Sequence, residues 1–263
     1  MHLVATIDGL ARVDGDEASV LDLPFPDVAA LLAAGEALSA NARCVRRVPL
    51  SDLKLIAPLG TTRAIWLVGL NYHSKAQITA RARPAQPLLF LKSPAAIGRP
   101  VELPTDMVDY EGEVAIVIGR TAFDLRPDEV WAHVAGISAA NDITARDIMM
   151  DTGSPTLAKS YPGFGVVGPS VLEVSEADIP IRTLVNGVVQ QDSSTAELIF
   201  SVPELVARLS RFAVLEPGDV VLTGTPAGTG QDRGTYLRPG DVVEVHAGAA
   251  LPLRTEFCER KPA

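Results

Sequence analysis

The pattern of hydrophobic and polar positions predicts many short strands and few helices. Apolar runs of strand length end in polar or turn-forming residues, and they lie at 3–7, 17–21, 64–70, 87–92 and 114–118. Two Pro-Gly-Asp turns lead into further strands at 220–222 and 242–244. An Asn-Gly pair at 186–187 separates two strand-like segments and predicts a hairpin, because these residues accept the positive φ of a two-residue turn.

Helical patterns are shorter and fewer. An alanine- and leucine-rich segment at 26–39, a Pro-led segment at 125–133 and a segment at 205–210 preceded by a capping box at Ser201–Glu204 predict helices. Strands do not alternate with long helices in the second half, which argues against a doubly wound dinucleotide fold. We expect a mixed, β-rich α/β chain with a small N-terminal domain at 1–57 and a main domain at 58–263, divided at a Pro-Leu-Gly-Thr turn.

The segment 109–119 begins with carboxylates and continues as a hydrophobic strand. Alternation places Asp109, Glu111 and Glu113 on one face, and the apolar run at 114–118 is typical of a strand buried on both sides. The glutamates would then enter the interior, where a divalent cation can compensate their charge. The alternative is a solvated strand end, which is the commoner case for a Glu-x-Glu tripeptide considered alone.

Composition narrows the class of protein. The net charge of -9 over 263 residues argues against a nucleic-acid binder and favours a small-molecule ligand. Cys44 and Cys258 stand far apart without nearby ligand-spaced residues, so we expect two free thiols rather than a disulfide or a zinc site. The first residues lack the pattern of a secretory signal and no apolar run has the length of a membrane span, which predicts a cytoplasmic protein without membrane contact.

Three polar segments leave alternatives open. Residues 74–83, after the strand at 64–70, are polar and basic and predict either a lid or an ordinary surface loop. Asp142 has the position of a helix cap, and a helix there would place it on one face with Arg146. Lys159 lies in a Gly- and Pro-rich segment without regular structure, where a lysine is solvated unless the segment folds over the acids. The glycine-rich segment 224–230 lacks the spacing of a phosphate loop.

Several motifs in this order resemble the fumarylacetoacetate hydrolase family. They are Gly-Leu-Asn-Tyr at 69–72, Asp-Tyr-Glu-Gly-Glu at 109–113, Asn-Asp-Ile-Thr-Ala-Arg-Asp at 141–147, Lys-Ser at 159–160 and Thr-Gly-Thr-Pro-Ala-Gly at 223–228. Together they span about the last four-fifths of the chain. The resemblance implies a mixed β-roll core behind a small N-terminal domain, and a homodimer.

The resemblance also implies a set of functional residues. Glu111, Glu113 and Asp142 would bind Mg²⁺ or Mn²⁺, and the substrate would be a small 2-oxo acid or 1,3-dicarbonyl acid. Lys159 would stabilise a developing enolate. The residues expected to bind or orient the substrate are Arg146, Thr225, Gly224 and Tyr72.

One departure from the family pattern affects the expected reaction. Hydrolases of this family typically have an Asn-Tyr-x-x-His-x-x-Glu motif whose His and Glu activate water. In this sequence Lys75 stands at the position of the His and Ile78 at the position of the Glu. Either His73 or Lys75 takes over proton transfer, or the reaction needs no activated water. Carbon–carbon hydrolysis is the first expectation; decarboxylation or enol–keto isomerisation is the alternative, and a non-catalytic binding protein is a third.

Overall fold

The computed structural model describes residues 1–80, 82–94, 100–174 and 178–260. Within these ranges the larger sheet has eleven strands. In spatial order they are β4 (Cys44–Pro49), β3 (Glu17–Leu21), β2 (Gly9–Asp14), β1 (His2–Thr6), β13 (Gly165–Leu172), β11 (Val134–Asp142), β10 (Gly112–Ile118), β16 (Val220–Leu222), β6 (Ile65–Gly69) and β7 (Leu88–Lys92), with β5 (Leu55–Ile56) beside β1.

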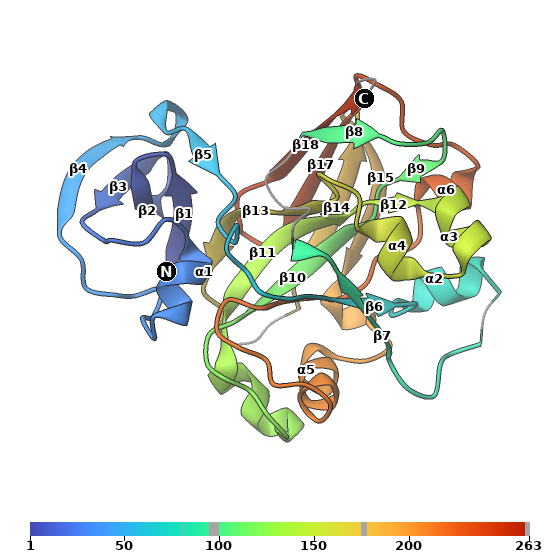
Figure 1. Ribbon diagram of the computed structural model, residues 1–263, viewed down its shortest axis with the longest axis horizontal. Helices are drawn as coiled ribbons and strands as arrows, with labels where there is room; N and C mark the ends of the chain where they lie inside the picture. Colours follow the sequence, from blue (N-terminus) through green and yellow to red (C-terminus); the bar gives the residue numbers. More distant parts are fainter. Residues whose placement is uncertain (81, 95–99, 175–177, 261–263) are drawn as a thin grey trace.

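A second sheet of five strands packs against the centre of the first (Figure 1). Its order is β15 (Val188–Ser194), β14 (Pro180–Val185), β17 (Val242–Ala247), β18 (Leu253–Glu259) and β8 (Val101–Leu103). A short ladder joins β9 (Val108–Asp109) to β12 (Thr144–Ala145). The prediction of a mixed, strand-rich α/β fold is confirmed.

The described helices are short, and several of them lie together at one side of the sheets (Figure 1). They are α1 (Val28–Ala33), α2 (His73–Ile78), α3 (Arg146–Thr152), α4 (Pro155–Lys159), α5 (Val202–Ser210) and α6 (Gly230–Arg233), with 3-10 turns at Leu50–Asp52, Pro127–His133 and Thr195–Glu197. None of the helices in the described residues is long and apolar enough to cross a membrane.

Strand β10 forms the centre of the core because both of its faces are buried. Val114 and Ile116 pack in a cluster with Val243 of the second sheet, whereas Ala115 and Val117 pack on the other side in the cluster that contains α1. The sequence prediction of a strand buried on both faces is therefore confirmed. This burial also fixes which way the neighbouring glutamates point.

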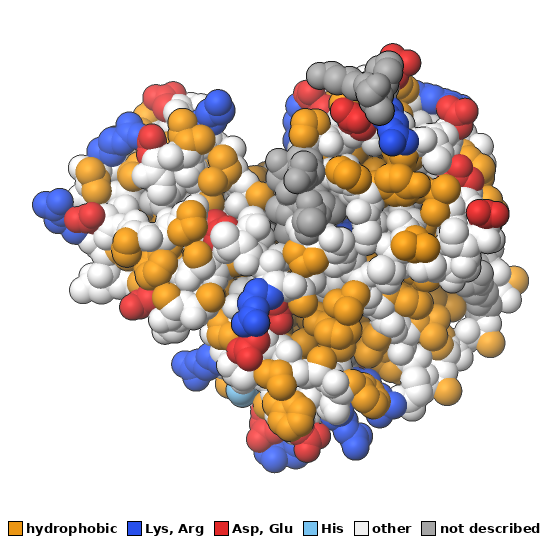
Figure 2. Space-filling view, viewed as in Figure 1, with side chains coloured by type: hydrophobic (Ala, Val, Ile, Leu, Met, Phe, Trp, Pro, Cys, Tyr) orange, Lys and Arg blue, Asp and Glu red, His pale blue; other side chains and the backbone are white. Residues whose placement is uncertain are grey.

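The first residues of the chain form a lobe of β1–β5 and α1 beside the core (Figure 1). Its sheet is continuous with the core sheet, because β1 pairs with β13 in antiparallel register. Figure 2 shows a notch between this lobe and the core, with acidic and basic side chains interspersed over the visible face. The division into domains at 1–57 and 58–263 stays a prediction.

The hairpin turn and the helix start that local sequence signals predicted are confirmed. Asn186 and Gly187 have φ of 50° and 79° and join β14 to β15, and the Ser201–Glu204 capping box begins α5. The helix expected at 26–39 is only the six-residue α1, because Gly35 turns the chain with φ of 83° soon after the helix ends. Cys44 and Cys258 are free thiols.

Three expectations around the acidic segment are wrong in detail. The strand expected from residue 109 is broken, since Asp109 ends β9 and β10 begins only at Gly112. Asp142 ends strand β11 and caps no helix; α3 begins at Arg146, so the two residues share no helical face. Lys159 is the last residue of α4, which Ser154 caps by accepting from the backbone N–H of Leu157.

Candidate active site

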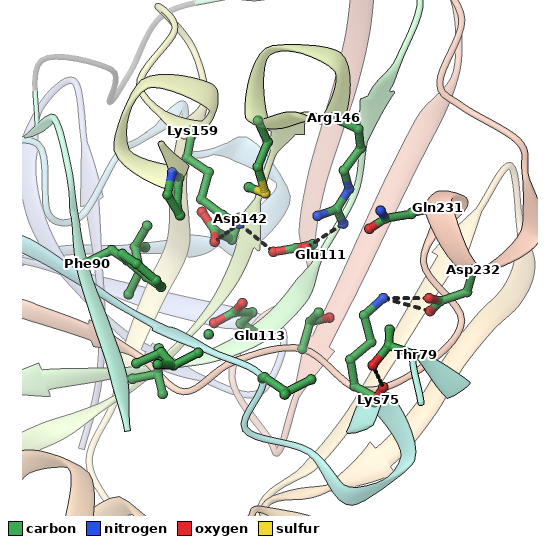
Figure 3. Close-up of a pocket in the computed structure, with 18 of the residues that line it drawn as sticks. Lys75, Thr79, Phe90, Glu111, Glu113, Asp142, Arg146, Lys159, Gln231 and Asp232 are labelled. Atoms are coloured by element: carbon green, nitrogen blue, oxygen red, sulfur yellow. Dashed lines mark hydrogen bonds and ion pairs between the residues drawn. The ribbon is translucent and has the colours of Figure 1, made fainter. Parts of the chain in front are cut away.

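A cavity of about 540 Å³ opens where α2, α3, α4 and α6 surround the ends of β6 and β10 (Figures 1 and 3). Phe90, Leu67, Ile78 and Met149 contribute apolar wall. The polar side chains that line it are Lys75, Thr79, Glu111, Glu113, Asp142, Arg146, Lys159, Thr225, Gln231 and Asp232. The cavity thus joins most of the residues that the sequence motifs suggested, from segments far apart in the chain.

Three carboxylates meet on one wall of the cavity. Glu111, Glu113 and Asp142 each offer one oxygen, and these oxygens lie within 4.8 Å of one another. The antiparallel register of β10 and β11, which pairs Gly112 with Asn141, brings them together. Glu111 and Glu113 are 7% and 2% exposed, so the expectation that they enter the interior is confirmed and the solvated strand end is wrong.

Gly112, between the two glutamates, faces the second sheet. A Cβ atom there would lie 1.8 Å from Oγ1 of Thr183, so no larger residue fits without displacing β14. Thr225 Oγ1 donates to the Gly112 carbonyl at 2.9 Å and accepts from Nε2 of Gln191 at 2.8 Å. These contacts fix the backbone from which Glu111 and Glu113 project.

Lys159 neutralises part of the acidic cluster. Its Nζ donates to Oε2 of Glu111 at 2.6 Å and to Oδ2 of Asp142 at 2.5 Å (Figure 3). It also donates to Oγ1 of Thr144 at 2.8 Å. Burial alone would lower the pKa of Lys159, but the charges of Asp142 and Glu111 outweigh it and raise the pKa. Lys159 is therefore an ammonium group at neutral pH, buried rather than solvated.

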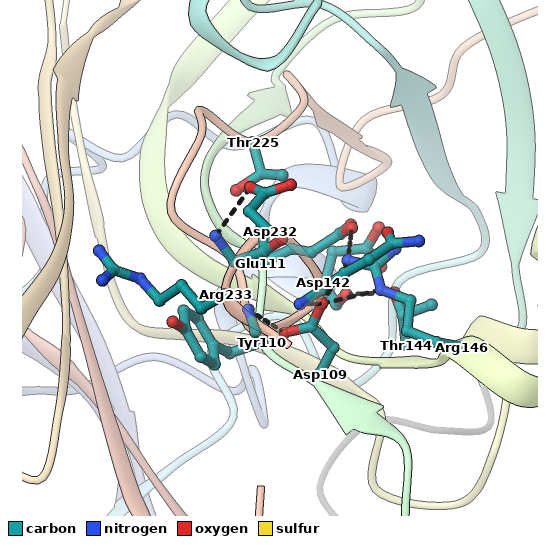
Figure 4. A network of polar contacts seen from close by, with 12 residues as sticks. Asp109, Tyr110, Glu111, Asp142, Thr144, Arg146, Thr225, Asp232 and Arg233 are labelled. Carbon is teal, nitrogen blue, oxygen red and sulfur yellow. Dashed lines mark hydrogen bonds and ion pairs between the residues drawn. The ribbon is translucent and has the colours of Figure 1, made fainter. Parts of the chain in front are cut away.

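Arg146 holds Glu111 from the other side (Figure 4). Its Nη2 donates to Oε1 of Glu111 at 2.5 Å, and its Nε donates to Oδ2 of Asp109 at 2.8 Å. Burial raises the pKa of Glu111, but the charges of Arg146 and Lys159 outweigh burial and hold it well below its usual range. Glu111 is thus an ionised carboxylate in a fixed orientation.

Glu113 is the least compensated acid of the cluster. It accepts from the backbone N–H of Gly224 at 2.7 Å, and no described cation lies within ion-pair distance of it. Burial, with the charges of Asp142 and Glu111, raises the pKa of Glu113 well above its usual value. Three carboxylates, one of them unpaired, form an all-oxygen donor set that fits a hard divalent cation such as Mg²⁺ or Mn²⁺.

Lys92 is a buried contact that the sequence pattern did not reveal. Its Nζ lies 2.6 Å from Oδ1 of Asp142 and donates to the carbonyl of Phe164 at 2.8 Å. The side chain is 2% exposed, and burial lowers the pKa of Lys92. A lysine at the end of the apolar run 87–92 was the available signal.

A second ion pair lies at the other end of the cavity and was also missed. Lys75 Nζ donates to both carboxylate oxygens of Asp232, at 2.7 and 2.8 Å (Figure 3). It also donates to Oγ1 of Thr229 at 2.8 Å. The spacing of Thr229 and Asp232 is that of a capping box, which is a sequence signal for the start of α6.

His73, Tyr72 and Gly224 lie outside the cavity lining. His73 is the exposed first residue of α2, and Tyr72 is fully buried in the core. Gly224 contacts Glu113 through its backbone only. Lys75 and Ile78, at the positions that match the water-activating pair of family hydrolases, both line the cavity. The catalytic and substrate-binding roles of all these residues stay predictions.

Comparisons with known proteins agree with this architecture. The family model of the fumarylacetoacetate (FAA) hydrolase C-terminal domain matches residues 64–257. Oxaloacetate tautomerase YisK of Bacillus subtilis (strain 168) is 35% identical over 211 residues, which are 74% of this chain and 70% of that protein.

Two solved structures are similar over nearly the whole chain. Fumarylacetoacetate hydrolase from psychrophilic Exiguobacterium antarcticum has a TM-score of 0.88 and 30% identity, covering 99% of this chain and 100% of that one. The 2-hydroxyhepta-2,4-diene-1,7-dioate isomerase from Mycobacterium marinum has a TM-score of 0.80 and 30% identity, covering 100% of both chains. The similarity therefore includes the N-terminal lobe as well as the cavity.

Proposed function

Because the chain belongs to the fumarylacetoacetate hydrolase family, we propose that it is a divalent-metal-dependent enzyme that moves a proton within a small 2-oxo acid. The reaction is an enol–keto tautomerisation or a double-bond isomerisation. The names of the B. subtilis tautomerase and the M. marinum isomerase support this reaction class. Proton relocation thereby takes precedence over carbon–carbon hydrolysis, which was the first expectation from the sequence.

The proposal depends on the side chains at the place in the cavity where a hydrolase of this family would activate water. Ile78 has no proton to exchange, Lys75 is bound by Asp232, and His73 points to solvent. Of the described residues that line the cavity, none is a histidine. Hydrolysis must make a nucleophile from water, whereas proton relocation needs a stabilised enolate and a group that accepts a proton from one substrate atom and returns it to another.

The chain's own residues suit enolate chemistry. A bound divalent cation supplies a Lewis acid that polarises the carbonyl of a 2-oxo acid. Lys159, held as an ammonium group by Glu111 and Asp142, places a positive charge beside the carboxylates, where it would stabilise the negative charge of an enolate. Arg146 keeps Glu111 ionised and oriented, and the backbone N–H of Gly224 orients Glu113 by a hydrogen bond.

Hydrolysis of a 1,3-dicarbonyl acid is the second candidate, since one solved relative is named as a fumarylacetoacetate hydrolase. Decarboxylation would use the same enolate, and a non-catalytic metal-binding protein would keep the acidic cluster without turnover. The proposal includes a homodimer with a small-molecule ligand. Sedimentation or light scattering gives the oligomeric state directly.

The experiment follows the ultraviolet absorbance of the enol form of oxaloacetate and of a 2-hydroxydiene dioate with Mg²⁺, with Mn²⁺ and with chelator. The proposal expects metal-dependent decay of the enol signal, abolished in Glu113→Ala and retained in Lys54→Met, an exposed-lysine control. An acylpyruvate as sole substrate, cleaved to two acids, would replace the proposal with hydrolysis. Metal binding without any turnover would favour the non-catalytic alternative.

A further inference from the structure

Helix α2 and its C-cap residue form one wall of the cavity. Lys75, Ile78 and Thr79 line it, and their spacing of three and four residues places them on one helical face. His73 and Gln77 are exposed. The helix has only six residues, so its position depends on tertiary contacts rather than on its own helical stability.

One of these contacts is the ion pair of Lys75 with Asp232. The two side chains are 10% and 4% exposed, so the pair is largely protected from solvent screening. Lys75 and Asp232 are 157 positions apart in the sequence, and their bond therefore cross-links α2 to α6. Charge-assisted hydrogen bonds of this kind are stronger than neutral ones.

Asp232 is itself held rigidly. It accepts from the backbone N–H groups of Gly228 at 2.9 Å and Thr229 at 3.1 Å. Burial raises the pKa of Asp232, but the hydrogen bond and charge of Lys75 and the backbone donors outweigh burial and lower it. The carboxylate that receives Lys75 is therefore a fixed anchor.

The anchor is continuous with the acidic cluster (Figure 4). The first N–H groups of α6, from Gly230 and Gln231, donate to Asp109 at 2.6 and 3.0 Å. Asp109 in turn accepts from Arg146, which donates to Glu111. Helix α6 thus joins the wall formed by α2 to the wall that carries the carboxylates.

We propose that Lys75 is a positioning residue for the proposed reaction: its ion pair with Asp232 holds α2 closed over the cavity before substrate binds. All the bonds of the Lys75 ammonium described above go to Asp232 and Thr229, so it acts through the helix rather than on the substrate. The kinetic part of this inference rests on the proposed function.

The kinetic test compares Lys75→Met and Asp232→Asn with the exposed-lysine control Lys54→Met. When the ion pair is broken, substrate binding must also supply the free energy that holds α2 over the cavity, so KM rises by about tenfold or more. A tenfold rise corresponds to about 1.4 kcal/mol. The kcat at saturation stays within about threefold, because interactions made only in the transition state are unchanged. Loss of kcat at unchanged KM would instead place Lys75 in the chemical step and overturn the inference.

Amide hydrogen exchange of the metal-loaded, substrate-free protein tests the closed position without any turnover. Lys75→Met should speed exchange at 73–79 and at 228–233, while Lys54→Met leaves both segments unchanged. Equal exchange in Lys75→Met and the parent protein would overturn the inference. If the parent protein turns over no substrate, the proposed function fails, and this exchange difference still decides whether the ion pair holds α2.

Discussion

Replacing Lys159 with Met should destabilise the metal-free protein strongly. The substitution keeps most of the side-chain volume but removes the ammonium group that bonds Glu111 and Asp142. Breaking a buried ion pair costs about 3–5 kcal/mol. The lower end applies here, because Arg146 still pairs with Glu111 and Lys92 with Asp142.

A loss of about 3 kcal/mol corresponds to a fall in Tm of roughly 6–12 °C for a chain of this size. Thermal unfolding in chelator gives this number directly. A bound divalent cation supplies positive charge to the same acids, so the difference between Lys159→Met and the parent protein should shrink when Mn²⁺ or Mg²⁺ is added. The exposed-lysine variant Lys54→Met should unfold like the parent protein in both conditions.

Turnover gives a second readout of the same variant. Loss of a preorganised group that stabilises the charge of an enolate costs about 10²–10³ in kcat, so Lys159→Met should be almost inactive even when saturated with metal. A Tm in chelator within about 2 °C of the parent protein would refute the argument that Lys159 compensates the acids, because that difference corresponds to a change of at most about 1 kcal/mol in the free energy of unfolding.

Three further predictions concern Glu113, helix α2 and Gly224. Burial raises the pKa of Glu113 well above its ordinary value of 4.5, so the metal-free protein should lose stability as the pH rises from about 4.5 through that raised pKa. Glu113→Gln should remove this loss of stability and also the stabilisation by metal. Both effects are measured as Tm against pH. Lys75→His combined with Ile78→Glu should add metal-dependent cleavage of an acylpyruvate, measured as release of two acids; no cleavage would contradict the assigned role of positions 75 and 78. Gly224→Ala should lower Tm by several degrees and weaken metal binding in calorimetry, because φ is +93° and the new Cβ would lie 3.0 Å from Cβ of Asn71.

The sequence predicted the local elements well because their signals are local. The hairpin at Asn186–Gly187 and the capping box at Ser201–Glu204 depend on a few adjacent residues, and both were found as expected. The short α1 shows the limit, since an alanine-rich segment favours a long helix until Gly35 reverses the chain.

The acidic cluster could be predicted only in part. Burial of Glu111 and Glu113 followed from the strand pattern, whereas the contribution of Asp142 came from the family resemblance and not from its helix-cap position. The Lys75–Asp232 pair was not predictable, because it joins residues 157 positions apart. Contacts of this kind depend on tertiary packing, which a pattern of neighbours does not encode.

The central claim is that this chain moves a proton without cleaving carbon–carbon bonds. Proton NMR of oxaloacetate in D₂O, with the protein and a small amount of Mn²⁺ or Mg²⁺, measures deuterium incorporation at C3 and cleavage of the carbon skeleton in the same sample. We predict metal-dependent acceleration of enol–keto exchange at C3 with the four-carbon skeleton intact, and no acceleration in Glu113→Ala. Carbon–carbon cleavage as the principal metal-dependent reaction, with exchange at the uncatalysed rate, would contradict it.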